Sequence, residues 1–262
     1  MKILITGGTS GIGCSLSKKL IKNGHFVYLC VHHENQITPL IAKLKDQKVY
    51  NSKAIEILKL DITNKNDIEK IKNLEIDCLV NQAGIGLGGS LLNMEVKEIE
   101  KNFKTNFFGT LNLTKTYIQT RKNKQGKVLI TSSLAGIMPI PFLGAYCATK
   151  SALTTMALCL KKELKKTNLN IKIKLIQPGA YKTGFNDYMI ENKDKLDFAI
   201  FNKEKEKIIE NQKNLFKLIE KKNLNTITNK MYKAIISNNN KLIYRAPLMQ
   251  VLFTKLYQLM CK

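Results

Sequence analysis

Residues 2–13 read Lys-Ile-Leu-Ile-Thr-Gly-Gly-Thr-Ser-Gly-Ile-Gly, an apolar run that leads directly into a glycine-rich turn. The run predicts a β-strand over Lys2–Thr6, and the apolar spacing after the turn predicts a helix over Ile12–Asn23. A strand, a tight turn and a helix start in this order direct backbone N–H groups and the positive end of the helix dipole at one point, where a pyrophosphate can sit. The stretch therefore favours a dinucleotide-binding α/β fold over an ordinary glycine-rich turn.

The alternation of short β-rich runs and longer helical segments continues to about residue 180. The intervals between the runs are long enough for the helical crossovers that parallel strands need. We therefore expect one doubly wound Rossmann-type domain with a parallel sheet, spanning residues 1–262. The further strands are predicted over Phe26–Val31, Ala54–Leu60, Asp77–Asn81, Lys127–Ser132 and Ile171–Gln177.

From about residue 185 the pattern becomes mainly helical. The Lys- and Glu-rich stretch Glu191–Asn223 predicts one or two amphipathic helices. A helix over Thr226–Ile236, a short strand over Lys241–Tyr244 and a last helix over Leu248–Met260 are predicted to follow. We find no linker that would divide the chain into two domains.

The chain is strongly basic, with 43 Lys and Arg against 20 Asp and Glu and a net charge of +23. Only Arg121 and Arg245 are arginines, whereas phosphate and base recognition usually uses the bidentate Arg fork. We therefore interpret most of the charge as a solvated surface, and we expect no nucleic-acid partner. The composition also excludes a disordered, collagenous or coiled-coil protein.

The cysteines are scattered and form no CxxC pair, so we expect free, mostly buried thiols in a reducing compartment and no metal site. The first strand leaves no room for a signal peptide, and no run of about 18 apolar residues predicts a membrane span. We expect a cytoplasmic protein. The cysteines are Cys14, Cys30, Cys78, Cys147, Cys159 and Cys261.

Four segments, in the expected order and spacing, resemble the short-chain dehydrogenase/reductase family over residues 1 to about 185. They are similar to the family's TGxxxGxG, NNAG, Ser with YxxxK, and PGxxxT patterns, and the second departs from its pattern at Gln82. The resemblance implies an NAD(P)-dependent oxidoreductase. The matching residues are Thr6-Gly7-Gly8-Thr9-Ser10-Gly11-Ile12-Gly13, Asn81-Gln82-Ala83-Gly84, Ser133 with Tyr146-Cys147-Ala148-Thr149-Lys150, and Pro178-Gly179 with Thr183.

Tyr146 and Lys150 are four residues apart, so on a helix they share a face. A nearby ammonium favours the phenolate and is expected to lower the pKa of Tyr146 from about 10 toward the working pH. Tyr146 could then exchange a proton with a carbonyl or alcohol oxygen. By itself the pair also fits a half-buried Tyr beside a surface Lys, and the surrounding segments favour the catalytic interpretation.

Ser133 follows a predicted strand at the edge of the sheet where open α/β folds bind ligands. Its hydroxyl could hold the substrate oxygen against Tyr146. Ser132 is an equal candidate on spacing alone, and the resemblance favours Ser133. Asn106 resembles the family's helix Asn that anchors a proton-relay water, although an isolated Asn is more often a solvated helix position.

After the second strand the chain reads Val31-His32-His33-Glu34, with no acidic residue at the strand end to bind a ribose 2′-OH. His32 stands where many family members carry a basic residue, so NADP is favoured, with NAD as the alternative; Ser10 replaces the Arg or Lys often seen in the glycine loop. Two histidines without a third ligand do not predict a metal site. Asp61, followed by Ile62, resembles the family's adenine-contacting Asp; a helix N-cap beside Thr63 is the alternative.

The segment between Ser133 and Tyr146 carries no charge and predicts an apolar pocket for a lipid-like, steroid-like or long-chain molecule, unless its side chains belong to the core. Residues of about 185–224, which include Phe185, Tyr188 and Met189, resemble the family's variable substrate loop and are expected to form a helical lid. Tyr181 replaces a small aliphatic residue of the family. The pocket residues are Ile137, Met138, Ile140, Phe142 and Leu143.

The last helix, in the segment of about 246–262, places six apolar residues on one side and is too short to span a bilayer. We favour its packing on the domain or on a sister subunit over docking on an anionic membrane. The resemblance also implies a homodimer or homotetramer built through Asn106–Thr120 and Tyr146–Lys166. The six residues are Leu248, Val251, Leu252, Leu256, Leu259 and Met260.

The sequence therefore predicts an oxidoreductase that transfers a hydride between a nicotinamide and a carbonyl or alcohol carbon, with NADPH-dependent reduction favoured. The other function considered is a non-catalytic NAD(P)-binding sensor or scaffold. The intact set of Ser133, Tyr146 and Lys150 argues against that alternative.

Overall fold

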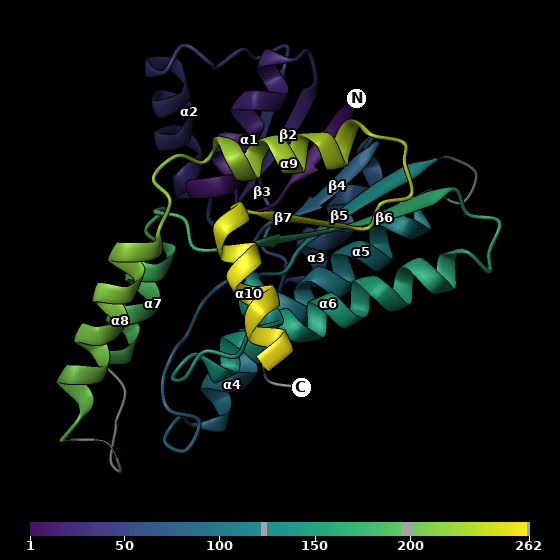
Figure 1. Ribbon diagram of the computed structural model, residues 1–262. Coiled ribbons are helices and arrows are strands. Elements are labelled where there is room, and N and C mark those ends of the chain that lie inside the picture. The colour runs from purple at the N-terminus through teal and green to yellow at the C-terminus, as the bar shows by residue number, and fades with distance from the viewer. Residues whose placement is uncertain (122–124, 195–200, 202, 261–262) are drawn as a thin grey trace.

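A seven-stranded parallel sheet lies at the centre of the computed structural model, which describes residues 1–121, 125–194, 201 and 203–260 (Figure 1). Its strand order, β3-β2-β1-β4-β5-β6-β7, reverses direction beside β1, so the chain winds first toward one edge and then toward the other. The predicted doubly wound α/β fold is confirmed. The strands are β1 (Lys2–Ile5), β2 (Phe26–Val31), β3 (Ile55–Lys59), β4 (Cys78–Asn81), β5 (Gly126–Thr131), β6 (Ile171–Pro178) and β7 (Ile243–Ala246).

Helices cover both faces of the sheet, and the side chains of each strand alternate between them. In β1, Ile3 and Ile5 pack with α1 (Gly11–Lys22), α2 (Ile37–Asp46) and α9 (Asn225–Ile236), whereas Leu4 packs on the opposite face. The opposite face is covered by α3 (Lys65–Glu69), α5 (Thr110–Gln119) and α6 (Gly144–Leu164), and α4 (Val96–Phe103) contacts α6.

Three further helices lie beyond the carboxyl ends of the strands. The predicted amphipathic stretch Glu191–Asn223 contains the end of α7 (Phe185–Asp194) and all of α8 (Lys205–Ile219); its residues 195–200 and 202 lie outside the described residues. The last helix, α10 (Leu248–Met260), crosses in front of the sheet edge near β7 (Figure 1). None of the helices that the structure describes combines the length and hydropathy needed to cross a bilayer.

The last strand begins two residues later than predicted because lysine side chains hold the backbone before it. Lys174 Nζ donates to the carbonyls of Asn239 and Lys241 at 2.5 and 2.9 Å, and Lys172 Nζ donates to that of Asn238 at 2.6 Å. Lys174 is 1% exposed, and burial lowers its pKa to about 8. Lys174 is therefore an exception to the interpretation of most of the basic charge as solvated surface.

The expected packing of the apolar side of α10 is wrong for the domain itself, and its packing on a sister subunit stays a prediction. Only Val251 of the six predicted residues is buried, and the other five are 49–79% exposed. The helix is instead anchored through its opposite face, where Thr254 is buried and Gln250 bonds to neighbouring backbone.

The cysteines of the described chain are free thiols, and four of the five are buried, whereas Cys159 is exposed. Cys261 lies outside the described residues. No group of three His, Cys, Asp or Glu side chains within residues 1–121, 125–194, 201 and 203–260 could hold a metal ion.

Candidate active site

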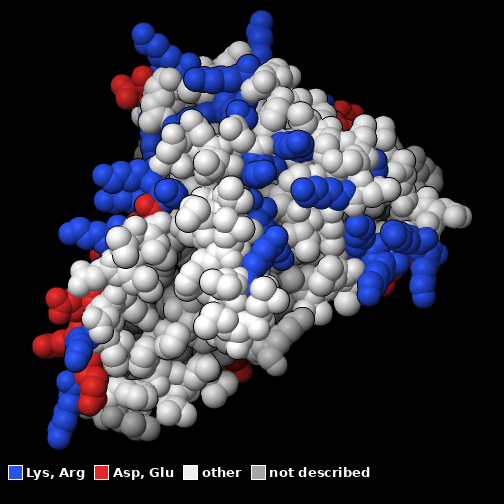
Figure 2. Space-filling model, in the orientation of Figure 1, with Lys and Arg blue, Asp and Glu red and all other residues white. Residues whose placement is uncertain are grey.

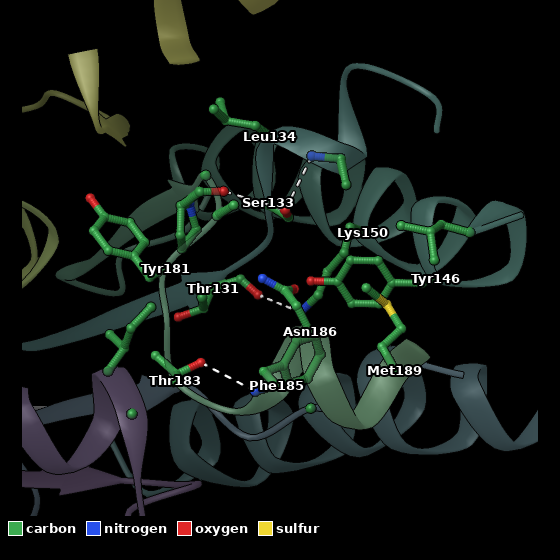
Figure 3. Close-up of a pocket in the computed structure, with 18 of the residues that line it drawn as sticks. Thr131, Ser133, Leu134, Tyr146, Lys150, Tyr181, Thr183, Phe185, Asn186 and Met189 are labelled. Atoms are coloured by element: carbon green, nitrogen blue, oxygen red, sulfur yellow. Dashed lines mark hydrogen bonds between the residues drawn. The ribbon is translucent and has the colours of Figure 1, made fainter. Parts of the chain in front are cut away.

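A cavity of about 770 Å³ lies at the carboxyl ends of the central strands. Its floor is formed by the turns that follow β1, β4, β5 and β6, and its walls by α6, α7, α8 and α10. Figure 3 shows Tyr146 and Lys150 from α6 beside residues of the segment after β6, including Thr183 and Phe185. The parallel strands thus bring turns that are far apart in the sequence to one edge of the sheet.

The glycine turn after β1 is closely packed against the chain around it. A Cβ atom built on Gly13 would lie 2.3 Å from the carbonyl oxygen of Gly7, and one built on Gly7 would lie 2.9 Å from Cα of Ala83. Gly7 and Gly11 have φ values of +70° and +56°, a backbone conformation that residues with a side chain rarely adopt. Ser10 makes no side-chain capping bond at the start of α1, so it leaves the backbone N–H groups of the first helical turn uncapped.

The turn after β4 is fixed by Thr6, whose Oγ1 accepts hydrogen bonds from the backbone N–H groups of Gln82 (3.1 Å) and Ala83 (3.0 Å). Gln82, where the sequence departs from the family pattern, accepts a 2.9 Å bond from Thr131 and lines the cavity. Asn81 does not line it, because its amide is buried and donates to Thr114 of α5 at 3.0 Å.

Tyr146 and Lys150 lie on one face of α6, as their spacing predicts. Lys150 Nζ is 5.5 Å from the centre of the Tyr146 ring and donates to the carbonyl of Thr131 at 3.1 Å. Both side chains are buried, and both line the cavity. Phe185 covers the tyrosine ring from the other side, with the two ring centres 5.7 Å apart.

The expected lowering of the pKa of Tyr146 is wrong for this structure. Burial raises that pKa above 10 and outweighs a side-chain hydrogen bond with Ser133 that acts in the opposite direction. Burial also lowers the pKa of Lys150, to about 8. Both groups are therefore shifted toward their uncharged forms, because the apolar surroundings disfavour either charge alone.

The two serines after β5 have different surroundings. Ser133 lines the cavity beside Tyr146, accepts a 3.1 Å bond from the N–H of Ala135 and donates to the carbonyl of Pro178 at 3.3 Å. Ser132 also lines the cavity, but it is 2% exposed and its hydroxyl donates to the carbonyl of Lys150 at 2.6 Å. This geometry favours Ser133 as the serine that can reach a ligand.

Asn106 is fully buried in a π-helical turn between α4 and α5 and does not line the cavity. Its Oδ1 accepts from the N–H of Ile85 at 2.8 Å, and its Nδ2 donates to the carbonyl of Ile85 at 2.9 Å and to Thr149 Oγ1 at 3.0 Å. The amide therefore connects the turn after β4 to α6. Its contacts are with the protein's own backbone and Thr149.

His32, Asp61 and Ile62 lie outside the cavity, beyond the ends of β2 and β3. His32 Nε2 is 3.2 Å from Asp61 Oδ2, and its side chain is 57% exposed. Burial tends to raise the pKa of Asp61, but hydrogen bonds from Thr63 and the contact with His32 lower it overall. Ile62 is buried against Gly109.

The segment after β6 is held by α10. The N–H of Ala180 donates to Gln250 Oε1 at 2.7 Å, and Gln250 Nε2 donates to the carbonyl of Ile219, at the end of α8, at 2.7 Å. A Cβ atom on Gly179 would lie 2.0 Å from the same Gln250 oxygen. The Tyr181 ring lines the cavity, while its hydroxyl shares a 2.8 Å hydrogen bond with Thr226.

The part of the cavity beyond Tyr146 is apolar. Of the predicted pocket residues, Met138, Ile140 and Leu143 line it, whereas Ile137 and Phe142 do not. Ile137 lines a smaller neighbouring cavity, and the Phe142 ring makes an edge-to-face contact with the ring of Phe201. The lid residues Phe185, Tyr188 and Met189 also line the main cavity.

The lining residues of α8 belong to the predicted lid of about 185–224 but were not predicted individually, and those of α10 were not predicted. The amphipathic pattern of α8 indicated that one face of this helix is buried. For α10 the only further indication was an amide on the side that faces the domain. Two hydrogen bonds fasten this region: Asn186 to Glu220 at 2.6 Å, and Gln212 to the carbonyl of Pro141 at 2.9 Å. The unpredicted lining residues are Leu215, Phe216, Ile219, Gln250, Phe253 and Thr254.

Comparisons with known proteins agree with this geometry. Residues 1–194 match the family model described as short chain dehydrogenase. The chain is 33% identical over 192 residues to 3-ketodihydrosphingosine reductase of Bacteroides thetaiotaomicron, covering 71% of this chain and 65% of that protein. It is 30% identical over 192 residues to estradiol 17-beta-dehydrogenase 2 of Mus musculus, covering 69% and 48%. The chain thus spans between about half and two thirds of the length of these relatives.

Solved structures share the fold. A short chain dehydrogenase/reductase from Burkholderia phymatum in complex with NAD superposes with a TM-score of 0.80 at 18% identity, covering 97% of this chain and 92% of that one. Serine dehydrogenase from Escherichia coli superposes with a TM-score of 0.60 at 26% identity, covering 69% and 83%. The first likeness is one of fold alone at this level of identity.

Proposed function

The chain belongs to the short-chain dehydrogenase/reductase family, and from this premise we propose that it is an NAD(P)-dependent oxidoreductase that interconverts a carbonyl and an alcohol on an apolar small molecule. The observation that carries the proposal is the meeting of Tyr146, Lys150 and Ser133 with the glycine turn in one cavity. The reductases and dehydrogenases among the relatives support the same class of enzyme.

The glycine turn fits a pyrophosphate. Side chains at Gly7 and Gly13 would collide with the backbone of Ala83 and of Gly7, so the tight turn depends on glycine at both positions, and α1 begins there without a side-chain cap. The turns after β4 and β6 would hold the nicotinamide half. The predicted contacts that line the cavity are Gly7, Thr9, Ser10, Gly11, Ile12, Gly13, Ala83, Gly84, Tyr146, Lys150, Pro178, Gly179 and Thr183.

A bound nicotinamide would supply or accept the hydride, which no side chain provides. The part played by the chain is to hold the substrate oxygen and to move a proton. In the reducing direction the phenol of Tyr146, kept neutral by burial, donates its proton to that oxygen. The hydroxyl of Ser133 holds the same oxygen by a hydrogen bond.

Lys150 stabilises the phenolate that remains after the proton has moved, and it would also bind the ribose hydroxyls of a bound cofactor. With a pKa of about 8 its ammonium keeps its proton at neutral pH. Asn106 contributes by fixing the turn after β4 against α6. Its part in a proton relay stays a prediction.

NADPH is the favoured reductant. β2 ends without an acidic residue to accept a ribose 2′-OH, and the exposed ring of His32 stands nearby with Asp61 as its partner. A 2′-phosphate would meet the imidazole of His32, which is paired with Asp61, and the hydroxyl of Ser10.

An apolar substrate is favoured because the cavity beyond Tyr146 is walled by aliphatic and aromatic side chains. The names of the relatives, a ketosphingosine reductase and an estradiol dehydrogenase, indicate lipid-like and steroid-like molecules. The segment of about 185–224 would act as the lid over such a substrate, fastened by Asn186 and Gln212.

The test is turnover on ketones of increasing chain length and on steroid ketones, with NADPH and NADH in parallel. We expect turnover to prefer apolar ketones and NADPH, and Tyr146→Phe to lose at least about three orders of magnitude in kcat with cofactor affinity nearly unchanged. Cofactor binding without turnover on any ketone or alcohol would instead support a non-catalytic sensor. Near-normal turnover of the Phe variant would contradict the assigned proton donor.

We also propose a homodimer or homotetramer through α5 and α6. Phe108, just before α5, and Leu158, on α6, are 53% and 39% exposed. Light scattering of Phe108→Gln should show a smaller particle than that of the unsubstituted chain if this face is the interface.

A further inference from the structure

The outer face of α10 is an unusually apolar surface. Seven side chains of this 13-residue helix are large, apolar and 49–79% exposed, and its one charged residue is Lys255. At 1.5 Å per residue the helix is about 20 Å long. We call this set the α10 face; its members are Leu248, Met249, Leu252, Phe253, Leu256, Leu259 and Met260.

The α10 face continues into the mouth of the catalytic cavity. Phe253 is 62% exposed and also lines the cavity, as do Leu215 of α8 and Tyr188 of α7, which are 45% and 52% exposed. Leu218 of α8 is 83% exposed. An apolar molecule leaving the cavity between α8 and α10 would therefore pass along apolar surface.

The chain around this surface is basic. Residues 211–260 contain eight Lys and one Arg against a single acidic residue, Glu220. Figure 2 shows mostly uncharged atoms over the lower part of α10 and toward α8, Lys and Arg side chains over α9 and down onto α10, and Asp and Glu mixed with Lys and Arg along the outer edge of α8. An apolar centre with a basic border complements an anionic lipid surface, where apolar side chains enter the acyl boundary and lysines meet the headgroups.

We propose that the α10 face docks on an anionic lipid bilayer and turns the mouth of the catalytic cavity toward the membrane. A second copy of the chain is the competing occupant, but a symmetric contact at this face would bring the lysines that border it in each copy close together. A bilayer would contact the apolar centre with its acyl chains and the basic border with its headgroups. It would also leave the cavity mouth open to molecules dissolved in the lipid.

The docking itself does not depend on the reaction, whereas the entry of substrate from the membrane rests on the proposed function. Binding is therefore measured without substrate. The first experiment is co-sedimentation of the full chain with vesicles of 30% phosphatidylglycerol in phosphatidylcholine, compared with pure phosphatidylcholine.

We expect binding to the anionic vesicles that weakens in 0.5 M salt. The variant Leu252→Gln/Leu256→Gln/Leu259→Gln, none of which lines the cavity, should lose at least tenfold in partition coefficient, and Lys255→Gln about fivefold. Lys43→Gln, on exposed α2 at the opposite edge of the sheet, is the charge-matched control and should change little.

A second measurement uses the absence of tryptophan from the chain. Leu256→Trp introduces a single tryptophan, which can be excited selectively, on the α10 face, and Ala42→Trp places one on exposed α2. On anionic vesicles the first should shift to shorter wavelength and be quenched by lipids brominated on the acyl chain, whereas the second should do neither.

Three results would overturn the proposal. The first is absence of vesicle binding, or equal binding of the triple Gln variant. The second is a lipid-free oligomer that the triple variant dissociates, which would assign the face to a second copy. The third is a fall of several degrees in the Tm of the triple variant, which would show that these side chains are packed in solution. Docking with no ketone turnover would leave the docking standing and remove the proposed function alone.

Discussion

Substitution of Asn106 by Ala separates a structural part for this side chain from a part in proton transfer. The amide makes three hydrogen bonds, two with the backbone of Ile85 and one with Thr149, all between 2.8 and 3.0 Å. Asn106 itself is fully buried, so the methyl group of Ala would leave a void and remove all three bonds.

The cost can be worked from these contacts. A typical hydrogen bond contributes about 1 kcal/mol net, and a buried polar group left without a partner costs about 1–3 kcal/mol. Thr149 keeps its 2.8 Å bond to the carbonyl of Tyr146, and Ile85 is half-buried. We therefore expect the cost of each group left without a partner to lie near the lower end of its range. The sum is about 2–4 kcal/mol in the free energy of unfolding, or roughly 5–15 °C in Tm for a chain of this size.

The assay is thermal unfolding followed by circular dichroism, beside Asn112→Ala, an exposed residue of α5 that should change Tm by no more than about 2 °C. Ketone reduction is measured at a temperature where both variants are folded. A Tm within about 2 °C of the unsubstituted chain would refute the structural argument. A hundredfold loss of kcat with that unchanged Tm would instead identify the proton relay.

Three further predictions concern the cofactor cradle and the buried lysines. Gly13→Ala places a Cβ atom 2.3 Å from the Gly7 oxygen, so NADPH affinity, measured by fluorescence titration, should fall at least tenfold; equal affinity would show that the turn is not the pyrophosphate site. Because the pKa of Lys150 is about 8, reduction should slow as pH rises through about 8 and the ammonium is lost, whereas Lys150→Arg should show no fall there. Lys174 has a folded pKa of about 8 against an ordinary 10.5, so the folded state releases its proton first and the free energy of unfolding should rise between those pH values. Urea unfolding of the Lys174→Met variant should show a free energy of unfolding that lacks the part of this rise that comes from Lys174.

Features that depend on neighbouring residues in the sequence could be predicted. The apolar run at Lys2–Thr6 and the glycines after it fix a strand and a turn whatever lies elsewhere, and β1 and α1 begin within a residue of the prediction. β7 begins two residues late because Lys172 and Lys174, about 65 positions earlier, hold the preceding loop. A contact between residues so far apart in the chain produces no recognisable pattern in the sequence around the strand.

The same distinction divides the site. The spacing of Tyr146 and Lys150 on one helix face follows from local geometry alone. Gln250 bonds Ala180 across 70 positions, and Phe253 reaches the cavity only because α10 turns back across the sheet edge. Exposure of the α10 face was likewise beyond the sequence, because an apolar stripe on a helix does not say which surface covers it.

The error over the pKa of Tyr146 changes how Lys150 should be understood. Burial disfavours the phenolate and the ammonium separately, raising one pKa and lowering the other. An ion pair of the two carries no net charge and is less costly to bury than either ion alone. The attraction of Lys150 for the phenolate therefore acts as the proton leaves Tyr146, and it is small while the phenol is neutral. An interaction that strengthens along the reaction lowers the barrier without tightening the ground state, so Lys150→Met should reduce kcat more than it raises the KM for the ketone.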